Sequence, residues 1–293
     1  MKQESSGLEK GNIGGYRLLA ELGKGATARV FRVEQPGGKD VYALKYGSCK
    51  ARLRAESAIL KQLRHPCFPR WIDEGEDAGG IYLVMEFIPG LSLQKLMELY
   101  PAGMPERMGG GIALDVAEGL AYLHAGGPSC IYRDLKASNV VITPQGRARL
   151  VDLGAAVRSE GFVQGGRAGT YGYSAPEQFW EGAGITPSCD IYGFGKLLAF
   201  LLTGQDPGKP PYDTMEYCGR HWGIGREFRR LLDQCLQPDP QLRYPDATFL
   251  PPILKRISER KGHFRDKILA KTGNRTSYRY IKCIWKSEYE RIF

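Results

Sequence analysis

The spacing of the apolar residues changes near Pro89 and Gly90, and this change limits what the chain can fold into. Residues 15–46 alternate between apolar and polar side chains and turn at "PGGKD", which is typical of antiparallel strands. Residues 52–63 have helical spacing, and residues 81–88 form an apolar run that predicts a further strand. The part before Gly90 therefore predicts a small, strand-rich lobe with one helix.

The part after Gly90 has a different pattern, because apolar residues recur there at helical spacing. Helices are predicted over residues 110–125, 191–204 and 225–237. The second of these is apolar on nearly all sides and is therefore expected to be buried. The expected fold class is α+β, with a small β-rich lobe joined to a larger, mainly helical lobe.

The net charge of +9 is concentrated at one end of the 293-residue chain. Residues 255–293 hold 12 Lys and Arg against 4 Asp and Glu, so the rest of the chain is close to neutral. In this tail, Ile281, Ile284 and Trp285 stand at helical spacing. The tail could pack on the chain's own lobe, dock a partner protein or bind a membrane surface, and nucleic-acid binding is the least favoured alternative.

The seven cysteines are scattered, and none forms a Cys-x-x-Cys pair. This pattern indicates reduced thiols, so a cytoplasmic location is expected. Cys218 and His221 form a Cys-x-x-His pair, but no second pair of ligands lies nearby, so no zinc site is expected. The apolar runs are too short to span a bilayer, and the N-terminal residues do not have the pattern of a signal peptide.

The sequence "IYRDLKASNVVI" at residues 131–142 places an acid, a cation and an amide between two apolar runs. Asp134 could accept a proton, Lys136 could neutralise a phosphate, and Asn139 could coordinate a metal ion. A solvated turn between two strands is the alternative interpretation, and this segment alone does not exclude it.

Other segments carry polar residues that also have ordinary structural interpretations. Gly23 and Gly25 in "LGKGATARV" would let backbone amides approach a phosphate, although many hairpins carry such glycines. Lys45 stands in an otherwise apolar strand, and Glu56 in the next helix could neutralise it. Asp152 lies between a strand and a glycine, where a carboxylate can face Mg²⁺.

The order of these segments is more specific than any one of them. G-x-G, a strand Lys, a helix Glu, R-D-L-K-x-x-x-N, D-L-G and "SAPE" follow one another along the chain. Together they make residues 15–257 resemble the eukaryotic-type serine/threonine protein kinases, most of all the compact bacterial members. The resemblance implies a two-lobed protein-kinase fold. It also implies ATP- and Mg²⁺-dependent transfer of the γ-phosphoryl group to Ser and Thr hydroxyls of protein substrates, with autophosphorylation.

The resemblance implies how ATP would be held. Gly23 and Gly25 would cover the phosphates, and Lys45, paired with Glu56, would contact the α- and β-phosphates. The strand "IYLVMEFIPG" resembles the hinge that meets the adenine ring. The residues expected around that ring are Met85 as the gatekeeper, Glu86 and Ile88 through their backbones, and Leu22, Val30, Ala43 and Val141 as apolar walls.

The resemblance also implies the catalytic set. Asp134 would be the catalytic base and Lys136 would steady the γ-phosphate, while Asn139 and Asp152 would bind Mg²⁺, or Mn²⁺ in its place. Thr170 would bond Asp134 and Lys136, and its presence with Lys136 favours Ser and Thr acceptors over Tyr.

Three further residues are implied to brace the helical lobe. Glu177 would form a buried ion pair with Arg243, and Asp190 would hold the backbone of the catalytic loop. The expected division is an N-terminal extension over 1–14, a kinase domain over 15–258 with lobes at 15–88 and 89–258, and a basic amphipathic tail over 259–293.

Some features depart from the family pattern. Tyr132 stands where a His is usual and Leu153 where a Phe is usual, but both positions are expected to pack in apolar surroundings, so activity should survive. The short interval between Lys45 and Glu56 predicts a trimmed connection into the helix. Between Gly154 and Gly169 the loop carries one hydroxyl, on Ser159, which suggests that activity does not depend on phosphorylation of several loop residues.

Two other functions are alternatives to a protein kinase. A pseudokinase that binds nucleotide or a partner without turnover is disfavoured, because Lys45, Asp134, Asn139 and Asp152 are all present. A small-molecule kinase on a related fold is disfavoured by "GTYGYSAPEQ", which resembles a peptide-docking loop.

Overall fold

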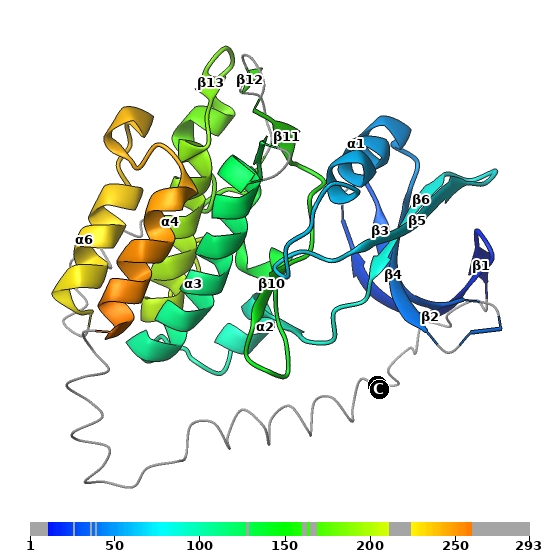
Figure 1. Cartoon of the computed structure of the whole chain (residues 1–293), viewed down its shortest axis with the longest axis horizontal. Coiled ribbons are helices and arrows are strands. Elements are labelled where there is room, and N and C mark those ends of the chain that lie inside the picture. The colour runs from blue at the N-terminus through cyan, green and yellow to red at the C-terminus, as the bar shows by residue number, and fades with distance from the viewer. Residues whose placement is uncertain are drawn as a thin grey trace, which may run out of the picture.

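The protein folds into two lobes, which Figure 1 shows side by side in this computed structural model. The structure describes residues 11–25, 27–35, 37–38, 40–126, 129–159, 163–164, 169–210 and 224–259. The Cys218 and His221 pair and the tail beyond residue 259 lie outside the described residues, so the structure does not test what the sequence suggests for them.

A six-stranded antiparallel sheet forms the small lobe, on the right in Figure 1. In space its strands follow the order β1-β2-β3-β4-β6-β5. They are β1 (Asn12–Ile13), β2 (Tyr16–Lys24), β3 (Arg29–Glu34), β4 (Val41–Gly47), β5 (Trp71–Glu76) and β6 (Ile81–Glu86). The strands predicted over residues 15–46 and 81–88 are confirmed. β5 was not predicted, because "WIDEGE" does not alternate between apolar and polar residues.

The two faces of the sheet bury different sets of side chains, as the period of two along a strand requires. In β4, Leu44 packs with Phe31 and Val33 in a cluster on one face. Ala43 points to the other face and belongs to the main hydrophobic core of the molecule. Lys45 lies two residues after Ala43 and so shares this second face, which places a cation at the edge of the main core.

The helix of the small lobe, α1 (Lys50–Leu60), begins three positions after Gly47, the last residue of β4. Only Ser48 and Cys49 lie between them, so the predicted trimmed connection is confirmed. α1 packs through Leu53, Ile59 and Leu60 against the core, and Glu56 is buried on the same side. The helix begins and ends two to three residues earlier than the pattern over 52–63 predicts.

The large lobe is mainly helical, as predicted. Its helices are α2 (Leu93–Met97), α3 (Glu106–Ala121), α4 (Ser188–Thr203) and α6 (Arg226–Cys235), and residues 250–259 are also helical. Short helical turns are η1 (Tyr122–Gly126), η2 (Ala137–Asn139), η3 (Pro176–Phe179), η4 (Pro240–Leu242) and η5 (Ala247–Phe249). Short strands are β7 (Leu91–Ser92), β8 (Cys130–Ile131), β9 (Val140–Ile142), β10 (Ala148–Leu150), β11 (Val157–Arg158), β12 (Val163–Gln164) and β13 (Gly184–Ile185).

Helix α4 runs through the centre of the large lobe, which explains its apolar sequence. All of its residues except Tyr192 are buried, so the prediction of a buried helix is confirmed. The helix ends at Gly204, whose φ of 73° lies in the left-handed region that favours glycine at a helix C-terminus. Burial fixes the two charged residues of α4, Asp190 and Lys196, inside the lobe.

Residues 87–90 join the last residue of β6 to the first residue of β7 and so connect the lobes. A Cβ atom at Gly90 would lie 2.5 Å from both the carbonyl oxygen of Ile142 and Cγ1 of Val141, so only glycine fits against β9 here. The two-lobed arrangement implied by the resemblance is confirmed.

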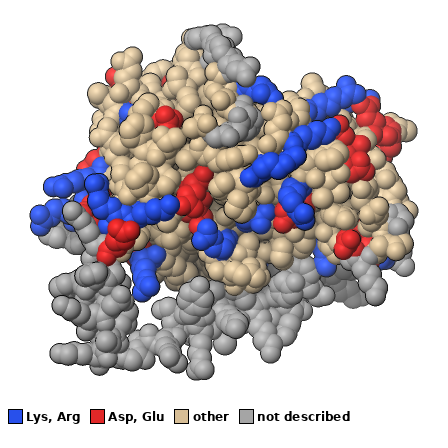
Figure 2. Space-filling view, in the orientation of Figure 1, with Lys and Arg blue, Asp and Glu red and all other residues tan. Residues whose placement is uncertain are grey.

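The charged side chains of the described surface are interspersed in sign on the face that Figure 2 shows. Over the small lobe, Lys61 pairs with Glu74, and Lys50 and Arg54 both pair with Glu76. This mixture agrees with a main body that is close to neutral.

Candidate active site

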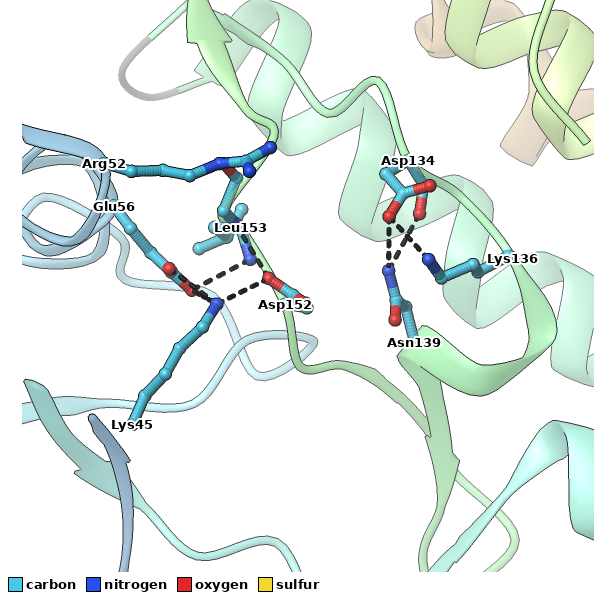
Figure 3. Close-up of polar contacts among 9 residues, drawn as sticks. Lys45, Arg52, Glu56, Asp134, Lys136, Asn139, Asp152 and Leu153 are labelled. Atoms are coloured by element: carbon cyan, nitrogen blue, oxygen red, sulfur yellow. Dashed lines mark hydrogen bonds and ion pairs between the residues drawn. The ribbon is translucent and has the colours of Figure 1, made fainter. Parts of the chain in front are cut away.

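Three charged side chains from different elements meet between the lobes (Figure 3). Lys45 Nζ in β4 lies 2.7 Å from Glu56 Oε2 in α1 and 2.9 Å from Asp152 Oδ1, which follows β10. The Glu56 side chain is only 3% exposed and the Asp152 side chain is 42% exposed. One cation therefore joins a buried carboxylate to a carboxylate that remains open to solvent.

The charges in this group shift one another's pKa. Burial would lower the pKa of Lys45, but the carboxylates of Glu56 and Asp152 outweigh burial and raise it. Burial would raise the pKa of Asp152, but the Lys45 ammonium outweighs it and lowers that pKa. Burial does raise the pKa of Glu56, against the opposing effect of Lys45. Lys45 and Asp152 are therefore held in their charged forms.

Backbone amides complete the surroundings of the two carboxylates. The amide of Leu153 donates to Glu56 Oε1 at 3.3 Å, and the amide of Gly154 donates to Asp152 Oδ1 at 2.8 Å. A Cβ atom at Gly154 would lie 3.0 Å from Asp152 Oδ1 and 3.1 Å from Lys45 Nζ. A larger residue at position 154 would therefore press on the ion group.

The second polar group lies in the loop between β8 and β9, and Asp134 is its centre (Figure 3). Lys136 Nζ donates to Asp134 Oδ2 at 2.8 Å, and Asn139 Nδ2 donates to the Asp134 carbonyl at 2.9 Å. The Thr170 hydroxyl donates to Asp134 Oδ1 at 2.7 Å and accepts from Lys136 Nζ at 3.0 Å. The structure therefore brings these four predicted residues together.

Asn139 and Asp152 present the oxygen atoms that a hard divalent cation prefers. Asn139 donates a hydrogen bond from Nδ2 to Asp134, which leaves its amide oxygen as the ligand atom. Asp152 accepts hydrogen bonds from Lys45 and Gly154 at Oδ1, which leaves Oδ2 as a second oxygen on a partly exposed carboxylate. No cluster of three His, Cys, Asp or Glu occurs among the described residues, and Mg²⁺ bound together with substrate phosphates needs none. The donor set fits this metal.

The loop that carries Asp134 is held from below by α4. The carboxylate of Asp190 accepts the amide of Tyr132 at 2.6 Å and the amide of Arg133 at 2.7 Å. Arg133 has a φ of 69°, a left-handed conformation that is costly for a residue with a Cβ atom. The two hydrogen bonds to Asp190 offset that cost immediately before Asp134, which agrees with the architectural role expected for Asp190.

The residues expected around an adenine ring lie on β2, β3, β4, β6 and β9 and in the segment after β6. Val30 pairs with Lys45 across β3 and β4, and Ala43 pairs with Met85 across β4 and β6. Ala43, Met85 and Ile88 are buried. The other members of the set are Leu22, which is exposed, Glu86, whose side chain accepts from Arg149, and Val141 in β9.

The two glycines of "LGKGATARV" lie at the turn between β2 and β3. Gly23 pairs with Val30, and the amide of Gly25 donates to the Ala28 carbonyl at 2.8 Å. A Cβ atom at Gly23 would meet no atom of the described residues within 4 Å, so packing against them does not explain this glycine. Open space beside this backbone is compatible with a phosphate that lies close to it.

The residues that depart from the family pattern are located as the sequence suggests. Tyr132 and Leu153 are both buried in the main core. The Ser159 hydroxyl donates to the Ser129 carbonyl at 2.7 Å, so it is tied to the backbone beside β8. Of the loop between Gly154 and Gly169, the structure describes residues 155–159 and 163–164 only.

The expected ion pair of the large lobe is confirmed. Arg243 Nη1 lies 2.6 Å from Glu177 Oε1, and both side chains are buried. Arg243 also donates to the carbonyls of Gln237 and Pro238, so its guanidinium links η3 to the segment before η4.

Two residues that support the site were not found from the sequence. His124 in η1 accepts the amide of Ala247 at Nδ1 and contacts Asp190 through Nε2 at 3.0 Å. Its Nε2 therefore carries the proton and donates to Asp190. Arg52 in α1 donates from Nε to the carbonyl of Gly154 at 2.9 Å. A lone His and an exposed helix Arg carry no signal that would reveal partners so distant in the chain.

Comparison with known proteins gives one family. The model of the protein kinase domain matches residues 16–250. Similar curated proteins include the serine/threonine-protein kinase PknD of Mycobacterium tuberculosis, 32% identical over 258 residues that cover 84% of this chain and 36% of the relative. The probable serine/threonine-protein kinase PkwA of Thermomonospora curvata is 29% identical, with 83% and 34% covered.

A third relative is the cytokinesis protein sepH of Aspergillus terreus, 30% identical with 82% of this chain and 18% of the relative covered. The chain thus spans about a third or less of the length of these relatives. Among the described residues, no helix has the length and apolar character needed to cross a membrane.

Proposed function

This chain belongs to the protein kinase family, and on that premise we propose that it transfers the γ-phosphoryl group of ATP to Ser and Thr hydroxyls of protein substrates. The observation that carries the proposal is the pair of polar groups in Figure 3, one around Lys45 and one around Asp134. Each group contains residue types that phosphoryl transfer needs, in hydrogen-bonded contact with one another.

In this proposal the residues around Lys45 bind ATP. Lys45 contacts the α- and β-phosphates, and Glu56 and Asp152 keep its ammonium charged and aimed. Gly23 and Gly25 cover the phosphates, because neither carries a side chain that would keep the backbone away from them. The adenine ring lies between the apolar residues Val30, Ala43 and Val141, with Met85 behind it and the backbones of Glu86 and Ile88 at its edge. Leu22 covers the outer side.

The residues around Asp134 act on the acceptor. The acceptor oxygen attacks the γ-phosphorus, the bond from that phosphorus to the bridging oxygen breaks, and ADP leaves. Asp134 takes the hydroxyl proton, and Lys136 neutralises charge on the transferred group. Mg²⁺, held by Asn139 and Asp152 together with the phosphates, would supply further neutralisation of phosphate charge. Thr170 keeps Asp134 and Lys136 in register.

The protein is also proposed to phosphorylate itself and to act in the cytoplasm. The described cysteines Cys49, Cys67, Cys130, Cys189 and Cys235 are all free thiols, which supports a reducing compartment. Protein substrates with Ser or Thr acceptors are the proposed partners.

The test is transfer of labelled γ-phosphate from ATP in the presence of Mg²⁺, with a generic basic protein as acceptor and autophosphorylation scored in parallel. The wild type should transfer phosphate, and Asp134→Asn should lose transfer while it retains Mg²⁺-dependent ATP binding. Binding without transfer by the wild type would instead indicate a pseudokinase, and the absence of both would contradict the proposal.

A further inference from the structure

One face of α1 contacts two consecutive residues after Asp152 (Figure 3). Glu56 accepts the amide of Leu153 at 3.3 Å, and Arg52 donates from Nε to the carbonyl of Gly154 at 2.9 Å. Residues four apart lie above one another on a helix, so Arg52 and Glu56 share this face. Helix α1 of the small lobe is therefore hydrogen-bonded to the backbone of two adjacent residues, Leu153 and Gly154.

The backbone of Gly154 contacts Asp152, which is a proposed metal ligand. Its amide donates to Asp152 Oδ1 at 2.8 Å, the oxygen that also accepts from Lys45. Its Cα region is so crowded that an added Cβ atom would lie 3.2 Å from Glu56 Oε2 and 3.0 Å from Asp152 Oδ1. The hydrogen bond from its amide therefore links the backbone of Gly154 directly to the Asp152 carboxylate.

Arg52 differs from the other basic residues of α1 in the direction of its contact. Lys50 and Arg54 both pair with Glu76 in β5, within the small lobe. Arg52 instead reaches a carbonyl 102 positions later in the chain, in the large lobe. It is exposed, so burial of its side chain does not explain the contact.

We propose that Arg52 is a positioning residue for Asp152, acting through the carbonyl of Gly154. Its loss should let the segment after Asp152 move more freely and should weaken use of Mg²⁺, while the fold is unchanged. The expected effect on activity rests on the proposed kinase function, whereas the effect on backbone mobility does not.

Four variants separate this role from a general effect of charge on the helix. Arg52→Met removes the donor and keeps an unbranched stem. Arg52→Gln keeps an N–H donor at the same number of bonds from the backbone, and Arg52→Lys keeps both a donor and the charge. The matched control is Arg54→Met, half a turn away on the same helix. All four changes exchange residues of similar helix propensity, so α1 should remain intact.

Two readouts are measured for each variant. The first is amide hydrogen exchange of Leu153 to Ala156, which should be about ten-fold faster in Arg52→Met, as the loss of one hydrogen bond from a charged donor predicts. The second is the Mg²⁺ concentration for half-maximal phosphate transfer, which should rise about ten-fold. Arg52→Gln and Arg52→Lys should restore most of both, and Arg54→Met should match the wild type.

The two readouts also separate the inference from the proposed function. If the wild type transfers no phosphate, the kinase proposal fails and amide exchange alone decides the role of Arg52. If Arg52→Met exchanges as slowly as Arg54→Met, or if Arg52→Gln and Arg52→Lys restore nothing, Arg52 does not position this segment.

Discussion

The hydroxyl of Thr170 donates a hydrogen bond to Asp134 Oδ1 at 2.7 Å, although 36 positions separate the two residues in the chain. The adjacent Gly169 has a φ of 130°, and a Cβ atom there would lie 2.2 Å from the Ser174 hydroxyl oxygen. The turn that presents Thr170 thus requires glycine. The side chain of Thr170 thus connects this turn to Asp134, the proposed base.

The contact between Thr170 and Asp134 predicts a defect in turnover. Thr170→Val keeps the shape but leaves Asp134 and Lys136 without their shared partner, and a hydrogen bond to a charged group contributes about 1.5–3 kcal/mol. We expect kcat to fall about ten-fold or more with little change in KM for ATP, whereas Thr170→Ser should keep most of the activity. Steady-state kinetics measure both, and an unchanged kcat in Thr170→Val would contradict the role.

The ion pair of Glu177 with Arg243 predicts a loss of stability. Glu177→Gln leaves the buried guanidinium without its counter-charge, and breaking a buried pair on one side costs about 3–5 kcal/mol. Urea unfolding should show a free energy of unfolding lower by roughly 3 kcal/mol. Lys61→Met, which breaks an exposed pair with Glu74, is the control and should cost less than about 1 kcal/mol. Equal losses in the two variants would show that burial does not matter here.

Asp152 predicts part of the acid response of the fold. Burial would raise the pKa of Asp152, but the Lys45 ammonium outweighs burial and lowers this pKa below 3.8. A carboxyl group whose pKa is lower in the folded state stabilises the fold above pH 3.8, and this contribution is lost as the pH falls through the folded value. The wild type should therefore lose more stability than Asp152→Asn between pH 6 and pH 2.5, by a small margin because the side chain is partly exposed. Parallel acid unfolding curves for the two proteins would contradict this.

The cysteines predict a graded reaction with thiol reagents. Burial raises the pKa of Cys67 to about 12, and Cys49 is exposed. Since the thiolate is the reactive form, iodoacetamide at about pH 8 should modify Cys49 in the folded protein and Cys67 only after unfolding. Peptide mapping by mass spectrometry assigns each site, and rapid modification of Cys67 in the native protein would be the contrary result.

Some parts of the fold follow from local pattern, and others depend on distant partners. The strands β2, β3, β4 and β6 and the buried helix α4 could be predicted because their apolar spacing has a clear period. β5 could not be, because it holds three acidic residues and a glycine and is ordered by pairing with β6. Glu76 binds Lys50 of α1 and Glu74 binds Lys61 directly after that helix, so these side chains do not pack in the core.

In the candidate site too, some residues could be predicted from local pattern and others depend on distant partners. Polar residues such as Asp134, Asn139 and Asp152 could be predicted because they stand out from apolar runs in a fixed order along the chain. The contact of Arg52 with Gly154 could not be, because nothing near Arg52 in the sequence distinguishes it from Arg54. Contacts of surface side chains across the lobes depend on the assembled fold.

The two-residue connection between β4 and α1 acts as a tether on the pair of Lys45 and Glu56. Because this connection is short, bringing Glu56 to Lys45 costs little chain entropy. It also gives the Glu56 carboxylate a high local concentration around the Lys45 ammonium. The connection also limits how far α1 can move from the sheet, since the three Cα–Cα steps from Gly47 to Lys50 span at most about 11 Å. Control of this site by a large swing of α1 is therefore disfavoured.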